Sequence, residues 1–150
     1  MTIGEICTRN TVVTTRDATV AAAAELMRQH HVGALVVVDS MNGGKRMPVG
    51  IVTDRDAVVE VMATGLDPNT ITVGDIMVQD LVTARESEGV LETMQIMRYK
   101  GVRRLPIVGK SGELIGIVSI DDLLEVLAEE ISELAKVISR EQSRETTTRT

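Results

Sequence analysis

Two short segments of the chain each place a hydroxyl and a carboxylate three residues apart, directly after a run of aliphatic residues. The segments are GIVTDRD at residues 50–56 and GIVSIDD at residues 116–122. Ser/Thr-x-x-Asp is the spacing of a capping box, in which both side chains satisfy free N–H groups at a helix start. The same groups could hold a sugar-phosphate, because a helix N-terminus attracts an anion and a carboxylate accepts hydrogen bonds from ribose hydroxyls. On the residues alone, both interpretations stay open.

Each segment begins with a glycine, Gly50 or Gly116. A residue without a Cβ lets another group approach the backbone closely. A helix cap does not need a glycine at this point. The two glycines therefore favour a ligand close to the backbone.

The two segments belong to a longer duplication, with offsets of 70 residues in its first part and 66 in its last. Each copy reads as a turn, a strand, a helix, two strands and a helix. The expected elements of the first copy are a helix over 20–30 capped by Thr19, a strand over 32–38, a loop over 39–46 and a helix over 54–63. Those of the second copy are a helix from Val90, a strand over 102–108 and a helix from Ile120. The sequence predicts an α+β fold with two β-α-β-β-α motifs, over residues 1–66 and 67–130. Residues 131–150 are expected to form a helical extension to about Arg140 and a disordered tail beyond Ser143.

The last helix carries aliphatic residues at spacings of 4, 3, 4, 3 and 4, which is a heptad pattern. They are Ile120, Leu124, Leu127, Ile131, Leu134 and Ile138. About two and a half heptads are too few for a stable isolated coiled coil. Packing across a homodimer axis, packing on another protein and core packing within one subunit all remain open.

Composition argues against several classes of function. The 150 residues include no Phe or Trp and one Tyr, and the net charge is −6, so neither stacking platforms nor a basic surface favours nucleic acid. Cys7 is the single cysteine, which fits a reducing, cytoplasmic setting. No signal peptide is recognised at the start, and the longest apolar run, 32–38, is too short for membrane insertion. His30 and His31 are adjacent rather than four residues apart, so no metal site is predicted. The sequence also shows no pairing of a nucleophile with a general base, so it does not suggest an enzyme.

With its two motifs and the Leu-Pro-Ile-Val run at 105–108, the chain resembles a tandem pair of CBS domains, named from cystathionine β-synthase. The likeness covers about residues 1–128 and is greatest to the stand-alone bacterial and archaeal type. It implies a pseudo-twofold module that binds adenosine compounds between its repeats: AMP, ADP, ATP, S-adenosylmethionine or an NAD-type molecule, with Mg²⁺ as an optional companion.

The resemblance also implies roles for individual residues. Asp56 and Asp122 would accept the ribose hydroxyls, while Thr53 and Ser119 would contact phosphate. Aliphatic contacts to the base would come from Val12, Val82, Pro48 and Leu114.

Arg103 and Arg104 occupy the positions of Gly33 and Ala34 in the first copy. By resemblance to kinase regulatory subunits, such residues reach the ligand phosphates; a solvated surface pair is the alternative. Lys100 would add to the local field. The two sites are therefore expected to differ in their preference for charged ligands.

The sequence thus predicts a regulatory module that senses an adenosine nucleotide and controls an unidentified partner protein. It is expected to be a homodimer and not an enzyme. The alternative is a structural or interaction protein with vestigial nucleotide sites that acts through its C-terminal helix.

Overall fold

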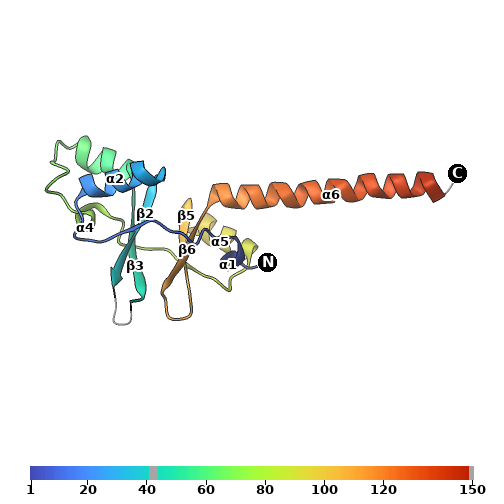
Figure 1. Cartoon of the computed structure of the whole chain (residues 1–150), viewed down its shortest axis with the longest axis horizontal. Coiled ribbons are helices and arrows are strands. Elements are labelled where there is room, and N and C mark those ends of the chain that lie inside the picture. Colours follow the sequence, from blue (N-terminus) through green and yellow to red (C-terminus); the bar gives the residue numbers. More distant parts are fainter. Residues whose placement is uncertain (41–43, 149–150) are drawn as a thin grey trace. The chain divides into compact units, whose positions relative to one another are not determined.

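The computed structural model describes residues 1–40 and 44–148. The first repeat contains α1 (Ile3–Ile6), β1 (Val13–Thr14), α2 (Val20–His30), β2 (Ala34–Ser40), β3 (Arg46–Thr53), α3 (Asp54–Asp56) and the π-helix η1 (Ala57–Met62). The second contains α4 (Val73–Ile76), β4 (Ala84–Arg85), α5 (Val90–Lys100), β5 (Arg104–Val108), β6 (Leu114–Ser119) and α6 (Ile120–Thr148) (Figure 1). This order confirms the predicted α+β fold with two β-α-β-β-α repeats. By packing, residues 1–118 form one compact unit and residues 119–150 a second.

Each repeat contributes one three-stranded sheet, in the orders β1-β2-β3 and β4-β5-β6. The first strand is parallel to the second in both sheets, and β2 is antiparallel to β3. A bulge between Val37 and Val38 shifts the register, so that Val37 pairs with Gly50 and Val38 with Pro48. Part of the predicted loop, residues 41–43, lies outside the described residues.

Helix α2 has the bounds that its sequence pattern predicts. The Thr19 hydroxyl accepts a hydrogen bond from the Ala22 N–H at 3.1 Å, which caps the helix. The helix ends at His31, whose φ of 53° lies in the left-handed region. The chain then needs Val32 and Gly33 to turn, so β2 begins at residue 34 rather than at 32 and continues to residue 40.

The two repeats exchange their opening segments. Val73 and Met77, from the start of the second repeat, are buried in the hydrophobic core of the first, against Met27 and Leu35. In the reverse direction, the Ile3 N–H donates to the Glu88 carbonyl at 2.7 Å, and the Thr8 N–H donates to that of Ile117 at 2.9 Å. The predicted division between residues 66 and 67 therefore separates the repeats along the sequence but does not separate their cores.

A second hydrophobic cluster joins the two sheets. Val36 and Val38 of β2 are buried with Leu114 of β6, and Val13 and Ile117 pack against them. In β2, Val36 and Val38 thus belong to this cluster, while Leu35 and Val37 belong to the helix-covered core. Burial of both faces explains the unbroken apolar run in the sequence.

The two motif glycines lie where the exchanged segments cross the sheets. A Cβ on Gly50 would lie 2.7 Å from the Met77 sulfur and 3.0 Å from the Val78 carbonyl oxygen. A Cβ on Gly116 would lie 2.6 Å from the Thr8 carbonyl oxygen. The close approach that both glycines permit is therefore made by the protein's own backbone.

The two repeats end in different helices. After the single α-turn of α3, the first continues as a π-helix, in which the Ala63 N–H donates to the Val58 carbonyl at 2.8 Å, rather than as the α-helix expected over 54–63. The second continues as α6 to Thr148, so the predicted end near Arg140 and the disordered tail beyond Ser143 are wrong.

The hydroxyl groups near the end of α6 are satisfied within the helix. The side chains of Thr146, Thr147 and Thr148 each donate to the carbonyl four residues earlier, at 2.8–2.9 Å. These bonds satisfy the hydroxyl protons without breaking the backbone hydrogen bonds of the helix, because each carbonyl oxygen has a second lone pair. Among the described residues, no helix is long and apolar enough to cross a membrane.

Replacing Gly116 with alanine should lower the free energy of unfolding by roughly 1–3 kcal/mol, because the new methyl group would press on the Thr8 backbone. Gly33→Ala is the matched control, since its nearest neighbour is the flexible Asp54 carboxylate at 3.0 Å. Urea unfolding of both variants measures the difference. Equal losses would contradict the assigned backbone crossing.

Candidate functional site

The first motif forms a reciprocal cap at the start of α3. The Thr53 N–H donates to Asp56 Oδ2 at 2.9 Å, and the Asp56 N–H donates to Thr53 Oγ1 at 3.2 Å. Both side chains are half-buried, whereas those of Asp54 and Arg55 are exposed. The capping-box interpretation of this spacing is confirmed.

The second motif has the same local geometry. The Ser119 N–H donates to Asp122 Oδ2 at 2.9 Å, and the Asp122 N–H donates to Ser119 Oγ at 3.2 Å. A capped helix start thus follows β3 and β6 alike, and the duplication extends to individual hydrogen bonds.

The caps leave hydrogen-bonding capacity unused. Each carboxylate engages Oδ2, and within residues 1–40 and 44–148 Oδ1 of Asp56 and of Asp122 has no hydrogen-bond partner. Each hydroxyl accepts a bond and keeps its own proton to donate. A diol and an anionic oxygen could therefore be bound without breaking the cap. Capping and a ligand role are compatible, and the ligand role remains a prediction.

The sequence argument for ligand contact at Gly50 and Gly116 was that a glycine lets a ligand approach the backbone. In the structure this close approach is made by the chain itself. The crossing segments at Met77–Val78 and Cys7–Thr8 account for Gly50 and Gly116.

The residues that begin the middle strand adjoin the motif in the first repeat. The Asp54 N–H donates to the Gly33 carbonyl at 2.9 Å. Arg103 and Arg104 hold the equivalent positions in the second repeat, immediately before β5 and at its first residue. Arg103 is exposed and Arg104 is half-buried. The repeats therefore differ by two positive charges at a position that, in the first repeat, lies beside the helix start.

The four aliphatic candidates for base contact lie in different surroundings. Val12 and Val82 are half-buried in the segments before β1 and β4, and Pro48 is half-buried in β3. Leu114 is only 7% exposed and packs in the cluster between the sheets. The structure gives Leu114 a packing role, while its contact with a ligand stays a prediction.

The described residues contain no group of three or more His, Cys, Asp or Glu side chains that could hold a metal ion. His30 is the last residue of α2 and His31 follows it in the left-handed conformation. The adjacent histidines thus lie at a helix end.

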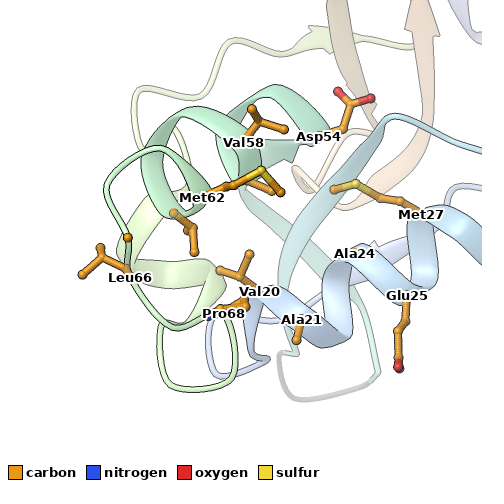
Figure 2. A pocket seen from close by; sticks show the side chains of 13 residues that line it. Val20, Ala21, Ala24, Glu25, Met27, Asp54, Val58, Met62, Leu66 and Pro68 are labelled. Atoms are coloured by element: carbon orange, nitrogen blue, oxygen red, sulfur yellow. The ribbon is translucent and has the colours of Figure 1, made fainter.

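An apolar pocket of about 800 Å³ lies between α2 and the helix after the first motif (Figure 2). Val20, Ala21, Ala24 and Met27 line it from α2. Ala57, Val58, Val61, Met62, Leu66 and Pro68 line it from η1 and the turn that follows. Its two acidic residues, Glu25 and Asp54, direct their carboxylates away from the interior.

Sequence reasoning did not find this pocket. No Arg or Lys lines it, so it offers no cation to a nucleotide phosphate. The available signal was a run of large aliphatic side chains after the motif, at Val58, Met62 and Leu66 with spacings of four. These three side chains are 51%, 75% and 47% exposed.

Two copies of the fold in tandem, each with a capped helix start after a Gly-Ile-Val strand, define a class of small paired modules. The model of the CBS domain matches residues 3–63 and 73–129. The chain belongs to the CBS domain family.

Relatives and solved structures agree with this assignment. An uncharacterized protein of Methanopyrus kandleri is 38% identical over 126 residues, which are 84% of this chain and 62% of that protein. The crystal structure of a conserved protein from Pyrococcus horikoshii is 29% identical, with a TM-score of 0.72 over 83% of this chain and 90% of that one.

The CBS domain pair of protein MJ0100 has the same fold. Its structure matches with a TM-score of 0.73 and 24% identity over 87% of this chain and 98% of that one. That protein was crystallised in complex with 5′-methylthioadenosine and S-adenosyl-L-methionine.

Asp56→Ala should lower the free energy of unfolding by about 1 kcal/mol, because the Thr53 N–H would lose its acceptor. Asp56→Asn should cost less, since the amide oxygen can still accept that bond. Asp54→Ala is the control: its carboxylate accepts from the Arg55 N–H and not from Thr53. Equal losses in all three variants, measured by urea unfolding, would mean that charge at the helix start matters rather than the cap.

Proposed function

We propose that the chain is a ligand-sensing regulatory module that binds an adenosine compound and is not an enzyme. The supporting observation is the duplicated helix cap, which keeps one carboxylate oxygen and one hydroxyl proton available in each repeat of a CBS pair. The adenosine ligands of the MJ0100 pair support the same class of ligand.

In this proposal the motif residues divide the ligand between them. Asp56 and Asp122 accept the ribose hydroxyls through Oδ1, and Thr53 and Ser119 donate to a phosphate oxygen. Val12, Val82, Pro48 and Leu114 are the proposed contacts to the base. Gly50 and Gly116 bring the strands to the motifs, and Mg²⁺ would accompany a di- or triphosphate.

Arg103 and Arg104 give the second repeat the means to bind a charged ligand. Gly33 and Ala34, at the equivalent positions, carry no charge. A guanidinium binds phosphate oxygens through paired hydrogen bonds. The proposed sites are therefore unequal, and nucleotides with phosphates depend on the arginines more than adenosine does.

A sensor must convert binding into a change that another molecule reads. A ligand shifts a conformational equilibrium only by its difference in affinity for the two states. In this proposal, binding favours one arrangement of the repeats, and a regulated protein or a second subunit of a homodimer responds to it. The single cysteine favours a reducing, cytoplasmic setting.

A thermal-shift screen of AMP, ADP, ATP, S-adenosylmethionine, NADH and adenosine, with and without Mg²⁺, tests the function. A ligand at 100 times its dissociation constant adds about 2.7 kcal/mol of stability, which raises Tm by several degrees in a domain of this size. We expect such a shift with at least one compound. No shift with any compound, on protein shown to be folded, would overturn the sensor proposal.

Replacing Arg103 and Arg104 together with alanine should weaken AMP or ATP binding by roughly 10–100-fold, because charged hydrogen bonds of about 1.5–3 kcal/mol are lost. Adenosine affinity should stay nearly unchanged. Arg28→Ala with Arg98→Ala is the control, since it removes the same charge from two exposed positions at helix ends. Calorimetric titration of the unchanged protein and both double variants gives the affinities for AMP and adenosine. Equal losses of AMP and adenosine affinity in the Arg103/Arg104 variant would contradict the phosphate role of these arginines.

A second candidate function, a structural or interaction protein with vestigial sites, is favoured by the exposed apolar residues of α6. Ile131, Leu134 and Ile138 are 66%, 67% and 59% exposed. In that function α6 docks on another protein and no adenosine compound alters stability. The ligand screen separates the two candidates.

A further inference from the structure

One face of α6 carries an apolar stripe, defined as Ile120, Leu124, Leu127, Ile131, Leu134 and Ile138. All six side chains are exposed, and four of them are more than half exposed. Val137, which is 61% exposed, widens the stripe near its end. Contiguous exposed aliphatic side chains are unfavourable in water and mark an interaction surface.

We propose that the apolar stripe packs against the same stripe of a second copy of this chain, with the two α6 helices antiparallel. This proposal goes beyond ligand sensing and does not depend on an adenosine ligand. It specifies the surface, the partner and the orientation of one contact between subunits.

The spacing of the stripe is self-complementary. The intervals 4, 3, 4, 3 and 4 read the same from either end. When a second copy runs in the opposite direction, three kinds of layer form, each between aliphatic residues. The layers are Ile120 with Ile138, Leu124 with Leu134, and Leu127 with Ile131. No stripe position of one helix is left facing a polar residue of the other.

The stripe has a defined end. The next two positions at the same spacing are 141 and 145, and both are glutamate. The aliphatic part therefore spans residues 120–138, or about 27 Å of helix at 1.5 Å per residue. This is the length over which the antiparallel layers match.

The charges of α6 favour the antiparallel orientation. Residues 120–133 include six acidic side chains and no basic one, giving a net charge of −6. Residues 134–148 include three basic and two acidic side chains, giving +1. A parallel pair would place every charge level with its own copy, which is unfavourable.

In the antiparallel pair, the acidic residues beside the stripe stand level with uncharged ones. Asp121 is level with Val137, and Glu130 is level with Ala128. The charged side chains of residues 122, 125, 129, 133 and 136 lie on the side of the helix opposite the stripe, so they add little to either orientation. Opposed helix dipoles also favour this orientation.

The contact must be weaker than that of a long coiled coil, because it has about two and a half heptads. Association should therefore depend on concentration in sedimentation experiments on the full-length protein. Each substitution in the stripe changes the contact at two places, because both copies contribute the same surface.

Leu134→Asp tests the surface. It would place two carboxylates in apolar layers, so we expect the dissociation constant of this contact to rise by at least ~100-fold. Ser132→Asp adds the same charge on the same helix at an exposed position outside the stripe, and its association should match that of the unchanged protein. Circular dichroism and urea unfolding check that both variants are folded.

Sedimentation at matched concentrations gives the outcome. The proposal expects the mass of the unchanged protein and of the Ser132→Asp variant to be twice that of Leu134→Asp. It is overturned if Leu134→Asp associates as the unchanged protein does, or if the unchanged protein remains a monomer at every concentration.

Cysteine cross-linking tests the orientation. Leu124 of one copy faces Leu134 of the other in the antiparallel pair, whereas the two copies of residue 134 lie about 15 Å apart along the axis. Mixing the Leu124→Cys and Leu134→Cys variants under oxidation should give a mixed disulfide, and Leu134→Cys alone should give none. Cross-linking of Leu134→Cys to itself would indicate a parallel pair and overturn the proposal. The unchanged protein, whose Cys7 is buried, is the background control.

Discussion

The structure depends on two backbone crossings that are copies of each other. Thr8 bridges Ile117, and Ile51 bridges Val78, so the opening segment of each repeat is bound to the last strand of the other sheet. Both crossings require a glycine, because a Cβ on Gly50 or Gly116 would lie within 3 Å of the crossing segment. The core of the first repeat is completed by Val73 and Met77 of the second. Each repeat therefore depends on the opening segment of the other repeat to pair with its last strand.

The crossed strands lead directly into the two helix caps, which hold the motif side chains in one conformation before any ligand arrives. Asp56 and Asp122 each use Oδ2 for the cap and keep Oδ1 available. Side chains that are already ordered lose less conformational entropy on binding. The helix cap is thus compatible with the proposed binding role of these residues and not an alternative to it.

The sequence alone was sufficient to predict the repeats, α2 with its Thr19 cap and the capping boxes, because each is encoded by neighbouring residues. It could not reveal the exchange of opening segments, since a duplicated sequence reads the same whether a segment packs on its own repeat or on the other. For that reason Gly50 and Gly116 were attributed to a ligand. The last residues of α6 were misassigned because threonine has a weak preference for helices, although the hydroxyls of residues 146–148 find acceptors within the helix, four residues earlier.

Duplication gave two similar frameworks, and the differences between them lie at equivalent positions. Gly33 and Ala34 in one repeat correspond to Arg103 and Arg104 in the other, which changes charge without changing the strand. After the motif, one repeat ends in a short π-helix beside an apolar pocket, and the other continues as α6. The stripe beyond Leu127 shares no residue with either cap. The proposed ligand preference and the proposed self-association can therefore change separately through substitutions, although α6 begins at the second motif.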